Sequence, residues 1–130
     1  MGGRLDWTID RVEEKRNNQQ YFHSKDFYSK INGYKMSMRI RINPDSRFEI
    51  CLFIWDDVKN KFLNWPFKAT VTMTIRGREG AEKSQRENIE LAQPGNNSYK
   101  YHDFHFEYSD LLAANLVVND CMTIECIVDE

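Results

Sequence analysis

Cysteine and histidine are the residue types best suited to do chemistry in this 130-residue chain, which has three of each. Cys51 could act as a nucleophile only beside a histidine base. It lies within an apolar run, where a thiol is buried and stays protonated, so catalysis at Cys51 is not expected. His102 and His105 are three residues apart in an expected strand, so they lie on opposite faces and cannot chelate one metal ion together. Neither a metal ion nor a cofactor is expected.

The sequence contains none of the common catalytic or nucleotide-binding motifs. It has no Gly-x-Ser-x-Gly elbow, Walker loop, dinucleotide fingerprint or His-Glu-x-x-His zinc motif. The carboxylate pairs Asp56-Asp57 and Asp129-Glu130 stand in an expected connection and at the chain end, where carboxylates contribute mainly to solubility. The chain is therefore expected not to be an enzyme. A reactive Cys51 in a cleft with a histidine would contradict this expectation.

Charge and hydropathy exclude several classes of partner. The formal net charge is −2 and the basic residues are scattered, so no nucleic acid is expected to bind. No apolar run approaches the ~20 residues that span a bilayer, and the first residues lack the layout of a signal peptide, so no membrane partner is expected. The same two observations predict a cytoplasmic location. In that compartment, three cysteines without paired spacing are expected to be free thiols.

Alternating apolar residues predict two neighbouring strands in the first half of the chain. From Met36 to Ile42 the even positions are apolar and the odd ones polar, which is typical of a half-buried strand with Arg39 and Arg41 on its outer face. After a turn at 43–46, a second strand carries apolar groups on both faces. One face has Phe48, Ile50, Leu52 and Ile54, and the other has Cys51, Phe53 and Trp55.

The remaining elements are expected to be short and separated by turns. Strands are predicted at 5–9, 69–76, 88–91, 98–108 and 121–128, with polar connections at 56–61, 77–86 and 94–97. The segment 11–20 is expected to be a helical turn or a solvated loop. A helix capped by Ser109 is expected to end at Asn115. The Asn32-Gly33 pair predicts a turn with positive φ at the glycine.

Together these elements predict an all-β fold in a single domain over residues 1–130. The expected architecture is an antiparallel β-sandwich of about eight strands with one short helix before the last strand. The sequence assigns no structural role to residues 1–3.

Pairs of arginines and tyrosines on shared strand faces are the candidate binding residues. Arg39 and Arg41 share one face, and Tyr99 and Tyr101 share another. Tyrosine and arginine are common hot-spot residues, because they bury a large area and keep a polar group. The pattern favours a peptide-binding surface. The alternative is that the tyrosines are exposed only because they are good strand formers.

Several short motifs together resemble the TRAF/MATH domain family. They are Leu5-x-Trp7-x-Ile9, Ser24-x-x-Phe27-Tyr28-Ser29, Gly33-Tyr34-Lys35-Met36, Arg39-Ile40, Trp65-Pro66-Phe67 and Asn119-Asp120-Cys121-Met122-Thr123-Ile124. The resemblance spans essentially the whole chain and implies a sandwich of about eight strands. It also implies binding of short extended peptides from receptors, adaptors or ubiquitin-pathway substrates. Such peptides lie beside an edge strand, in the mode called β-augmentation.

The resemblance further implies which residues bind the peptide. The pairing edge falls at 99–104, where Tyr99 and Tyr101 match aromatic residues that contact peptide side chains. Arg39 matches an arginine that lies near acidic or aromatic peptide residues. The implied peptide-binding residues are Arg39, Arg41, Phe48, Cys51, Tyr99, Lys100, Tyr101 and Asp103.

The sequence also departs from the family pattern. Cys51 stands where many receptor-binding members have phenylalanine, and Arg41 replaces a common tyrosine. The serine triplet that reads a glutamine in one known peptide motif is absent between Gly77 and Asn97. Ser84-Gln85-Arg86 resembles the substrate-adaptor branch, but Asn88 replaces an aromatic residue expected there. The branch therefore stays open.

Two classes of function follow from these observations. The first is a peptide-binding module of a signalling or ubiquitin-ligase adaptor. The second is a structural module that self-associates through the same aromatic edge. Receptor-associated relatives trimerise through a coiled coil ahead of this domain, and this sequence has no sustained heptads. The isolated domain is therefore expected to be a monomer.

Overall fold

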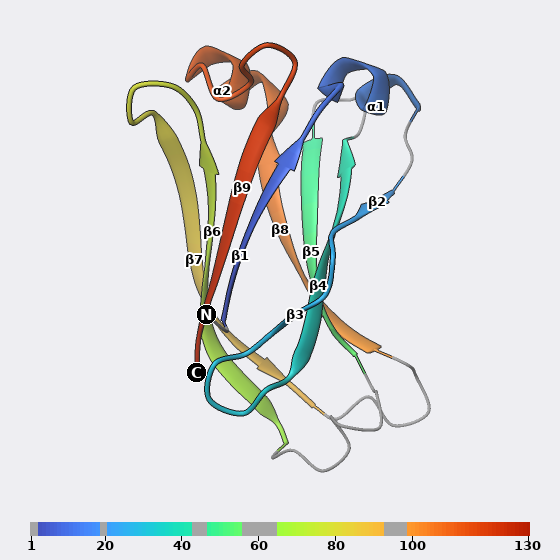
Figure 1. Ribbon diagram of the computed structural model, residues 1–130, viewed down its shortest axis with the longest axis vertical. Coiled ribbons are helices and arrows are strands. Elements are labelled where there is room, and N and C mark those ends of the chain that lie inside the picture. Colours follow the sequence, from blue (N-terminus) through green and yellow to red (C-terminus); the bar gives the residue numbers. More distant parts are fainter. Residues whose placement is uncertain (1–2, 19–20, 43–46, 56–64, 93–98) are drawn as a thin grey trace.

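Two antiparallel sheets face each other across an apolar core, and two short helices lie together at one end (Figure 1). The expected antiparallel β-sandwich with little helix is confirmed. The turns expected at 43–46 and 94–97 and the connection expected at 56–61 lie outside the described residues. The computed structural model describes residues 3–18, 21–42, 47–55, 65–92 and 99–130.

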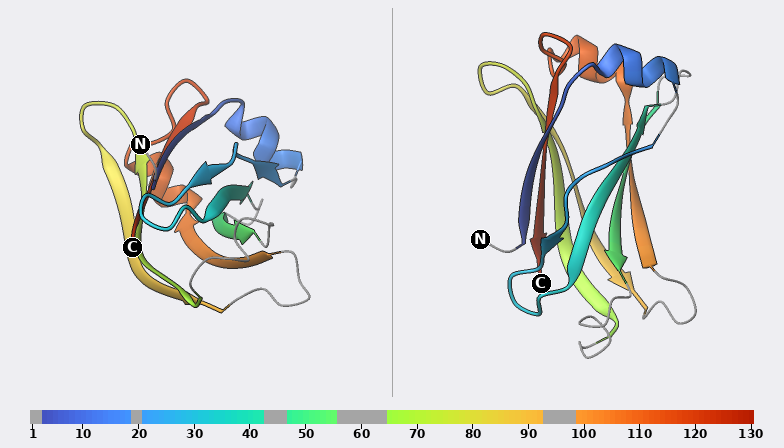
Figure 2. Two further views of the ribbon diagram at one scale, coloured as in Figure 1. Left: turned by 60° about the horizontal axis from the view of Figure 1, so that its bottom comes forward. Right: turned by 45° about the vertical axis from the view of Figure 1, so that its right-hand side comes forward.

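One sheet has four strands in the order β1-β9-β6-β7. Its strands are β1 (Arg4–Ile9), β6 (Phe67–Arg76), β7 (Glu82–Leu91) and β9 (Met122–Asp129). The start of β1 pairs with the end of β9, with Arg4 opposite Ile127. The carbonyl of Gly3 accepts a hydrogen bond from the Val128 N–H at 2.7 Å. Gly3 and the start of β1 therefore lie beside the end of β9 (Figures 1 and 2).

The other sheet has five strands in the order β2-β4-β5-β8, with β3 also paired to β4. Its strands are β2 (Phe22–His23), β3 (Phe27–Tyr28), β4 (Lys35–Ile42), β5 (Arg47–Trp55) and β8 (Tyr99–Glu107). The turn before β4 has φ +73° at Gly33, a left-handed conformation that favours glycine and that the Asn-Gly pair predicts.

The two helices are α1 (Val12–Asn18) and α2 (Tyr108–Ala113), and both lie at the same end of the sandwich (Figure 2). They contact each other through Tyr108, whose hydroxyl donates to Glu13 at 3.0 Å and whose ring lies 4.9 Å from the Arg16 guanidinium. In the described ranges, neither helix is long and apolar enough to cross a bilayer.

Strand alternation places the apolar core between the sheets. The inward residues of β4 and β5 are fully buried, and they are Met36, Met38, Ile40, Ile42, Phe48, Ile50, Leu52 and Ile54. They belong to one cluster with inward residues of the facing sheet, among them Val71, Met73, Ile75, Met122, Ile124 and Cys126. Because each large buried side chain contributes about 1.5–3 kcal/mol, this layer is what holds the two sheets together.

The segment 11–20 contains the helix α1, which the sequence did not distinguish from a loop. Val12 is fully buried, and its N–H donates to the carbonyl of Asp120 at 3.1 Å. The side chain of Asp120 accepts the N–H of Glu13 at 3.0 Å. The first turn of α1 is thus capped from a loop more than a hundred residues away, which local sequence cannot indicate.

Other local expectations also differ from the structure, among them the connection expected at 77–86, within which β7 begins. Ser109 does not cap α2: the helix begins at Tyr108, and its N-cap position is Glu107, without a side-chain cap. Gly3, to which the sequence assigned no structural role, donates its N–H to the Tyr28 carbonyl at 2.6 Å. That bond links the start of β1 to the opposite sheet.

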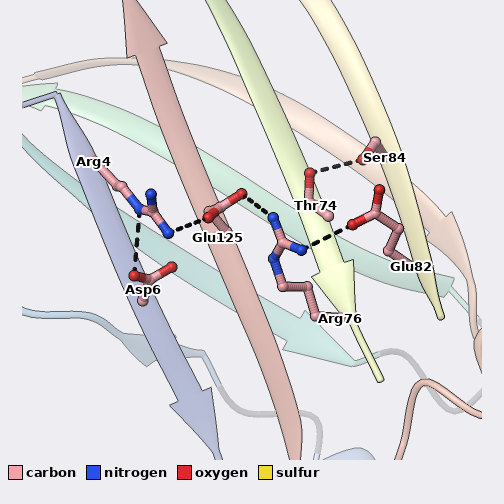
Figure 3. A network of polar contacts seen from close by, with 7 residues as sticks. All are labelled: Arg4, Asp6, Thr74, Arg76, Glu82, Ser84 and Glu125. Atoms are coloured by element: carbon pink, nitrogen blue, oxygen red, sulfur yellow. Dashed lines mark hydrogen bonds and ion pairs between the residues drawn. The ribbon is translucent and has the colours of Figure 1, made fainter. Parts of the chain in front are cut away.

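A row of charged side chains crosses the outer face of the four-stranded sheet (Figure 3). Glu125 of β9 is only 3% exposed and pairs with Arg4 of β1 at 2.5 Å and Arg76 of β6 at 2.8 Å. Arg4 also contacts Asp6 at 3.4 Å, and Arg76 also contacts Glu82 at 2.9 Å. The buried carboxylate of Glu125 thereby joins β9 to β1 and β6, and Arg76 extends the row to Glu82 of β7.

Candidate functional site

The outer face of the five-stranded sheet carries the odd-numbered residues of β4, β5 and β8. The strand register places Arg39 opposite Cys51, and Cys51 opposite Asp103, so these three residues form one row across the sheet. The adjoining rows contain Ser37, Phe53 and Tyr101, and then Trp55 and Tyr99. Residues that are far apart in the sequence thus share one continuous surface.

Cys51, at the centre of its row, is held as a protonated thiol. Its Sγ donates a hydrogen bond to the Asp103 carboxylate at 2.5 Å. Burial, followed by this hydrogen bond, raises the pKa of Cys51 to about 12. At neutral pH such a thiol is not a nucleophile. In the described ranges, no three His, Cys, Asp or Glu side chains gather as a metal site would require.

The raised pKa of Cys51 predicts a loss of stability at alkaline pH. A model thiol loses its proton near pH 9.0, whereas in the folded protein Cys51 keeps its proton until about pH 12. Between these values the folded state binds more protons than the unfolded state, so the free energy of unfolding falls as the pH rises. Burial also raises the pKa of Cys126 to about 12, which adds to the decline.

Cys51→Ala is therefore expected to show a shallower decline across this pH window than the wild type. Denaturant unfolding at a series of alkaline pH values measures the difference. Equal slopes for the two proteins would contradict the assignment to Cys51.

Four aromatic rings form a cluster beside this row. Phe53 lies beneath the others, with its ring centroid 4.9 Å from Tyr99, 5.6 Å from Trp55 and 5.8 Å from Tyr101. Trp55 donates its Nε1–H to the Ser37 hydroxyl at 2.9 Å, which fixes the indole. Phe53 is buried, whereas Tyr99 and Tyr101 are exposed at the surface. This arrangement offers apolar area with accessible hydroxyl groups, as interface hot spots do.

Two arginines lie on the other side of the row, stacked on aromatic rings. The Arg39 guanidinium lies 4.0 Å from the ring centroid of Tyr21 and 4.7 Å from that of Phe53, and Arg41 lies 5.5 Å from Tyr21. The Nε atoms of both arginines are buried and have no hydrogen-bond acceptor in the part of the chain that the structure describes. Among the described residues, neither arginine forms an ion pair with a carboxylate. Their charge is therefore available to an incoming acidic group.

The structure brings together six of the eight residues that the sequence predicted for binding. Arg39, Arg41, Cys51, Tyr99, Tyr101 and Asp103 lie on the outer face. Phe48 does not: it is an even-numbered residue of β5, points into the core and is fully buried. Lys100, opposite Ile54, also lies on the inward side of its strand. Strand alternation excludes both side chains from the outer face.

Three residues of this surface were not predicted as binding residues. The sequence could have indicated Phe53 and Trp55, because β5 has apolar groups on both faces and one of these faces had to lie outside the core. Tyr21 had none. It precedes the two-residue strand β2 and reaches Arg39 and Arg41 only through the fold.

β8 is an edge strand, because it pairs with β5 on one side only. Hydrogen bonds farther across the sheet identify which of its backbone groups are free. Met38 of β4 accepts the N–H of Ser24 at 2.8 Å, on the side away from β5. Successive residues of an antiparallel ladder bond in alternate directions. Odd residues of β4 therefore bond to β5, even residues of β5 bond to β8, and odd residues of β8 point away from the sheet.

The backbone groups of Tyr99, Tyr101, Asp103 and His105 thus point to the open edge. An independent contact agrees with this assignment, because the Gln85 side-chain amide donates to the His105 carbonyl from outside the sheet. An open edge with free N–H and C=O groups beside an aromatic and cationic face is a surface on which another strand can pair.

Comparison with known proteins agrees with this architecture. The chain belongs to the MATH domain family, whose model matches residues 4–128. MATH and TRAF domains are protein-interaction modules rather than enzymes. Among solved structures, the fold is similar to Notothenia coriiceps TRAF5, with a TM-score of 0.81, 19% identity, and coverage of 98% of this chain and 73% of that chain. No curated protein matches the sequence.

Proposed function

We propose that this domain binds an extended peptide by β-augmentation at the open edge of β8. In this mode the peptide pairs with backbone groups of the edge strand, and its side chains contact the adjoining sheet face. The observation that carries the proposal is that the open edge of β8 adjoins the cluster of Phe53, Trp55, Tyr99 and Tyr101. Backbone pairing provides affinity independent of sequence, and the aromatic and cationic face provides selectivity.

The available backbone groups fit a short paired segment. Tyr99, Tyr101 and Asp103 each offer one N–H and one C=O to an added strand. Peptide side chains on the outer face then meet the two exposed tyrosines and, farther in, Arg39 and Arg41. An acidic side chain would pair with the guanidiniums of Arg39 and Arg41, which have no carboxylate partner among the described residues, and an aromatic one would stack on the ring cluster.

The proposed setting is the cytoplasm, in a signalling or ubiquitin-ligase adaptor. Cys51, Cys121 and Cys126 are free thiols, and Cys51 and Cys126 are buried. Unpaired cysteines are typical of reducing compartments. Cys51 is 5% exposed, and its thiol stays protonated at neutral pH. It is proposed to support the binding face through its hydrogen bond to Asp103 rather than to take part in chemistry.

Tyr101→Ala is expected to weaken peptide binding by about 1–3 kcal/mol, roughly 5- to 150-fold, because Tyr101 is an exposed ring beside the pairing edge. A peptide taken from an array screened against the folded domain serves as the probe, and calorimetric titration measures the change. Tyr28→Ala is the matched control. Tyr28 is 46% exposed against 49% for Tyr101, but β4 and β5 separate it from β8.

Two outcomes would contradict the proposal. Equal affinities for wild type and Tyr101→Ala would remove the β8 edge from the binding site. A dimer that forms with increasing concentration and is lost on Tyr101→Ala would favour self-association through the same edge, and light scattering detects it.

A further inference from the structure

Polar side chains of β7 reach across to β8 and α2 where the two sheets adjoin. Lys83 contacts the Asp110 carboxylate at 3.3 Å, and Glu87 lies 2.9 Å from His102 Nε2. Between these contacts, Gln85 donates its side-chain amide to the His105 carbonyl. We call Lys83, Gln85 and Glu87, together with these three contacts, the polar seam.

The polar seam occupies positions that are usually apolar in a sandwich. Its three β7 residues stand opposite Ile75, Met73 and Val71 of β6, which are fully buried. Farther along the same face of β7, Ile89 is apolar and buried. Polar residues at these positions break the alternation that packing favours, and Lys83 and Glu87 remain 42% and 44% exposed at the edge of the sandwich. Such departures concentrate at functional sites. Here the departure is confined to the part of β7 that contacts β8 and α2.

Gln85 differs from its two neighbours because it bonds to the backbone of β8 rather than to a side chain. The His105 carbonyl points to the open edge of β8, as the carbonyls of Tyr99, Tyr101 and Asp103 do. A strand added to this edge would place a backbone N–H at hydrogen-bond distance from each carbonyl. At His105 that place is taken by the Gln85 amide nitrogen.

We propose that Gln85 is a specificity-determining residue that ends the peptide-pairing edge of β8 at Asp103. The inference rests on the proposed function. A bound peptide pairs along Tyr99–Asp103, a span of about 17 Å at ~3.4 Å per residue, and then leaves the sheet. The polar seam thereby limits the length of the paired segment and sets its register, because pairing cannot slip past Gln85.

The first test uses the ligand-free protein and detects the Gln85 contact directly. Hydrogen exchange of the Gln85 side-chain amide, followed by NMR, is expected to be slower than in a free glutamine side chain. Exchange as fast as in free glutamine would overturn the inference before any peptide is added.

The second test maps the paired segment in a complex. The probe is an array-selected peptide extended to about 16 residues. At about 3.4 Å per residue, an extended peptide of this length is longer than the whole of β8. At about 100 times its Kd, the peptide should slow backbone exchange about 100-fold at Tyr99, Tyr101 and Asp103. Exchange at His105 should be unchanged in the wild type.

Variants of Gln85 show whether it sets this limit. Gln85→Ala is expected to extend the protection to His105, and so is Gln85→Glu, which keeps the size but cannot donate to a carbonyl. Lys83→Ala is the matched control, because it removes another contact of the polar seam without freeing the edge, and its protection should still end at Asp103.

The outcomes separate this inference from the function on which it rests. Protection that reaches His105 in the wild type, or that ends at Asp103 in both Gln85 variants, overturns the role of Gln85 and leaves peptide binding intact. Absence of protection at Tyr99, Tyr101 and Asp103 overturns the proposed function, and this inference with it.

Discussion

Phe48→Ala is expected to lower the free energy of unfolding by about 3–5 kcal/mol, because it removes a fully buried ring from the core layer between the sheets. The family resemblance implied that Phe48 is a peptide-binding residue. Its burial on the inward face of β5 leads to a different expectation, in which the substitution changes stability and not peptide contact. Denaturant unfolding measures the loss.

Phe48→Leu separates the two roles of this position in a folded protein. Because it keeps most of the apolar volume, it should cost less stability than the alanine variant and leave peptide affinity within about twofold of wild type. Arg39→Ala is the contrasting variant, since it changes the outer face. A tenfold loss of affinity in a stable Phe48→Leu protein would return Phe48 to the site.

Glu125→Ala is expected to cost about 2–3 kcal/mol, the second large effect on stability. Removing one partner of a fully buried ion pair costs about 3–5 kcal/mol. The loss is smaller here because Arg4 and Arg76 are 51% and 48% exposed and regain water when the carboxylate is removed. Thermal and denaturant unfolding of the variant measure the cost.

Glu82→Ala is the control for this prediction. It removes a half-exposed carboxylate from Arg76, and such a surface pair contributes about 0–1 kcal/mol. Similar losses for Glu82→Ala and Glu125→Ala would show that the burial of Glu125 does not matter. A double-mutant cycle between Arg4 and Arg76 would then measure how far the two arginines depend on each other through their shared partner.

Period-2 alternation was sufficient to predict the strands that bury an apolar face. It identified Met36–Ile42 and the strand after it, and it placed Arg39, Arg41, Tyr99 and Tyr101 on strand faces that the structure brings to one surface. Alternation also predicts that Phe48 and Cys51, which are three positions apart in one strand, lie on opposite faces of the sheet. Phe48 is fully buried because it lies on the inward face of β5, whereas Cys51 lies on the outer face.

Elements stabilised by distant contacts could not be predicted in the same way. β7 begins at Glu82, inside a segment that was expected to be a turn. The sequence did not indicate this strand because the residues of the polar seam interrupt its apolar alternation. α1 is capped by Asp120, and Tyr21 reaches the site only by stacking on Arg39. These contacts depend on tertiary structure, which overrides local preference.

The adjacency of the first and last strands also determines how the domain responds to mechanical force. β1 and β9 are antiparallel, and Gly3 lies beside Val128. Tension between these two points acts perpendicular to the strands, along the hydrogen bonds between them. The hydrogen bonds of this pair therefore bear the force one after another rather than all at once. We therefore expect β1 to separate from β9 at low force, starting at Gly3 and Val128. β8 pairs with β5 in the other sheet, so this force does not act on it directly.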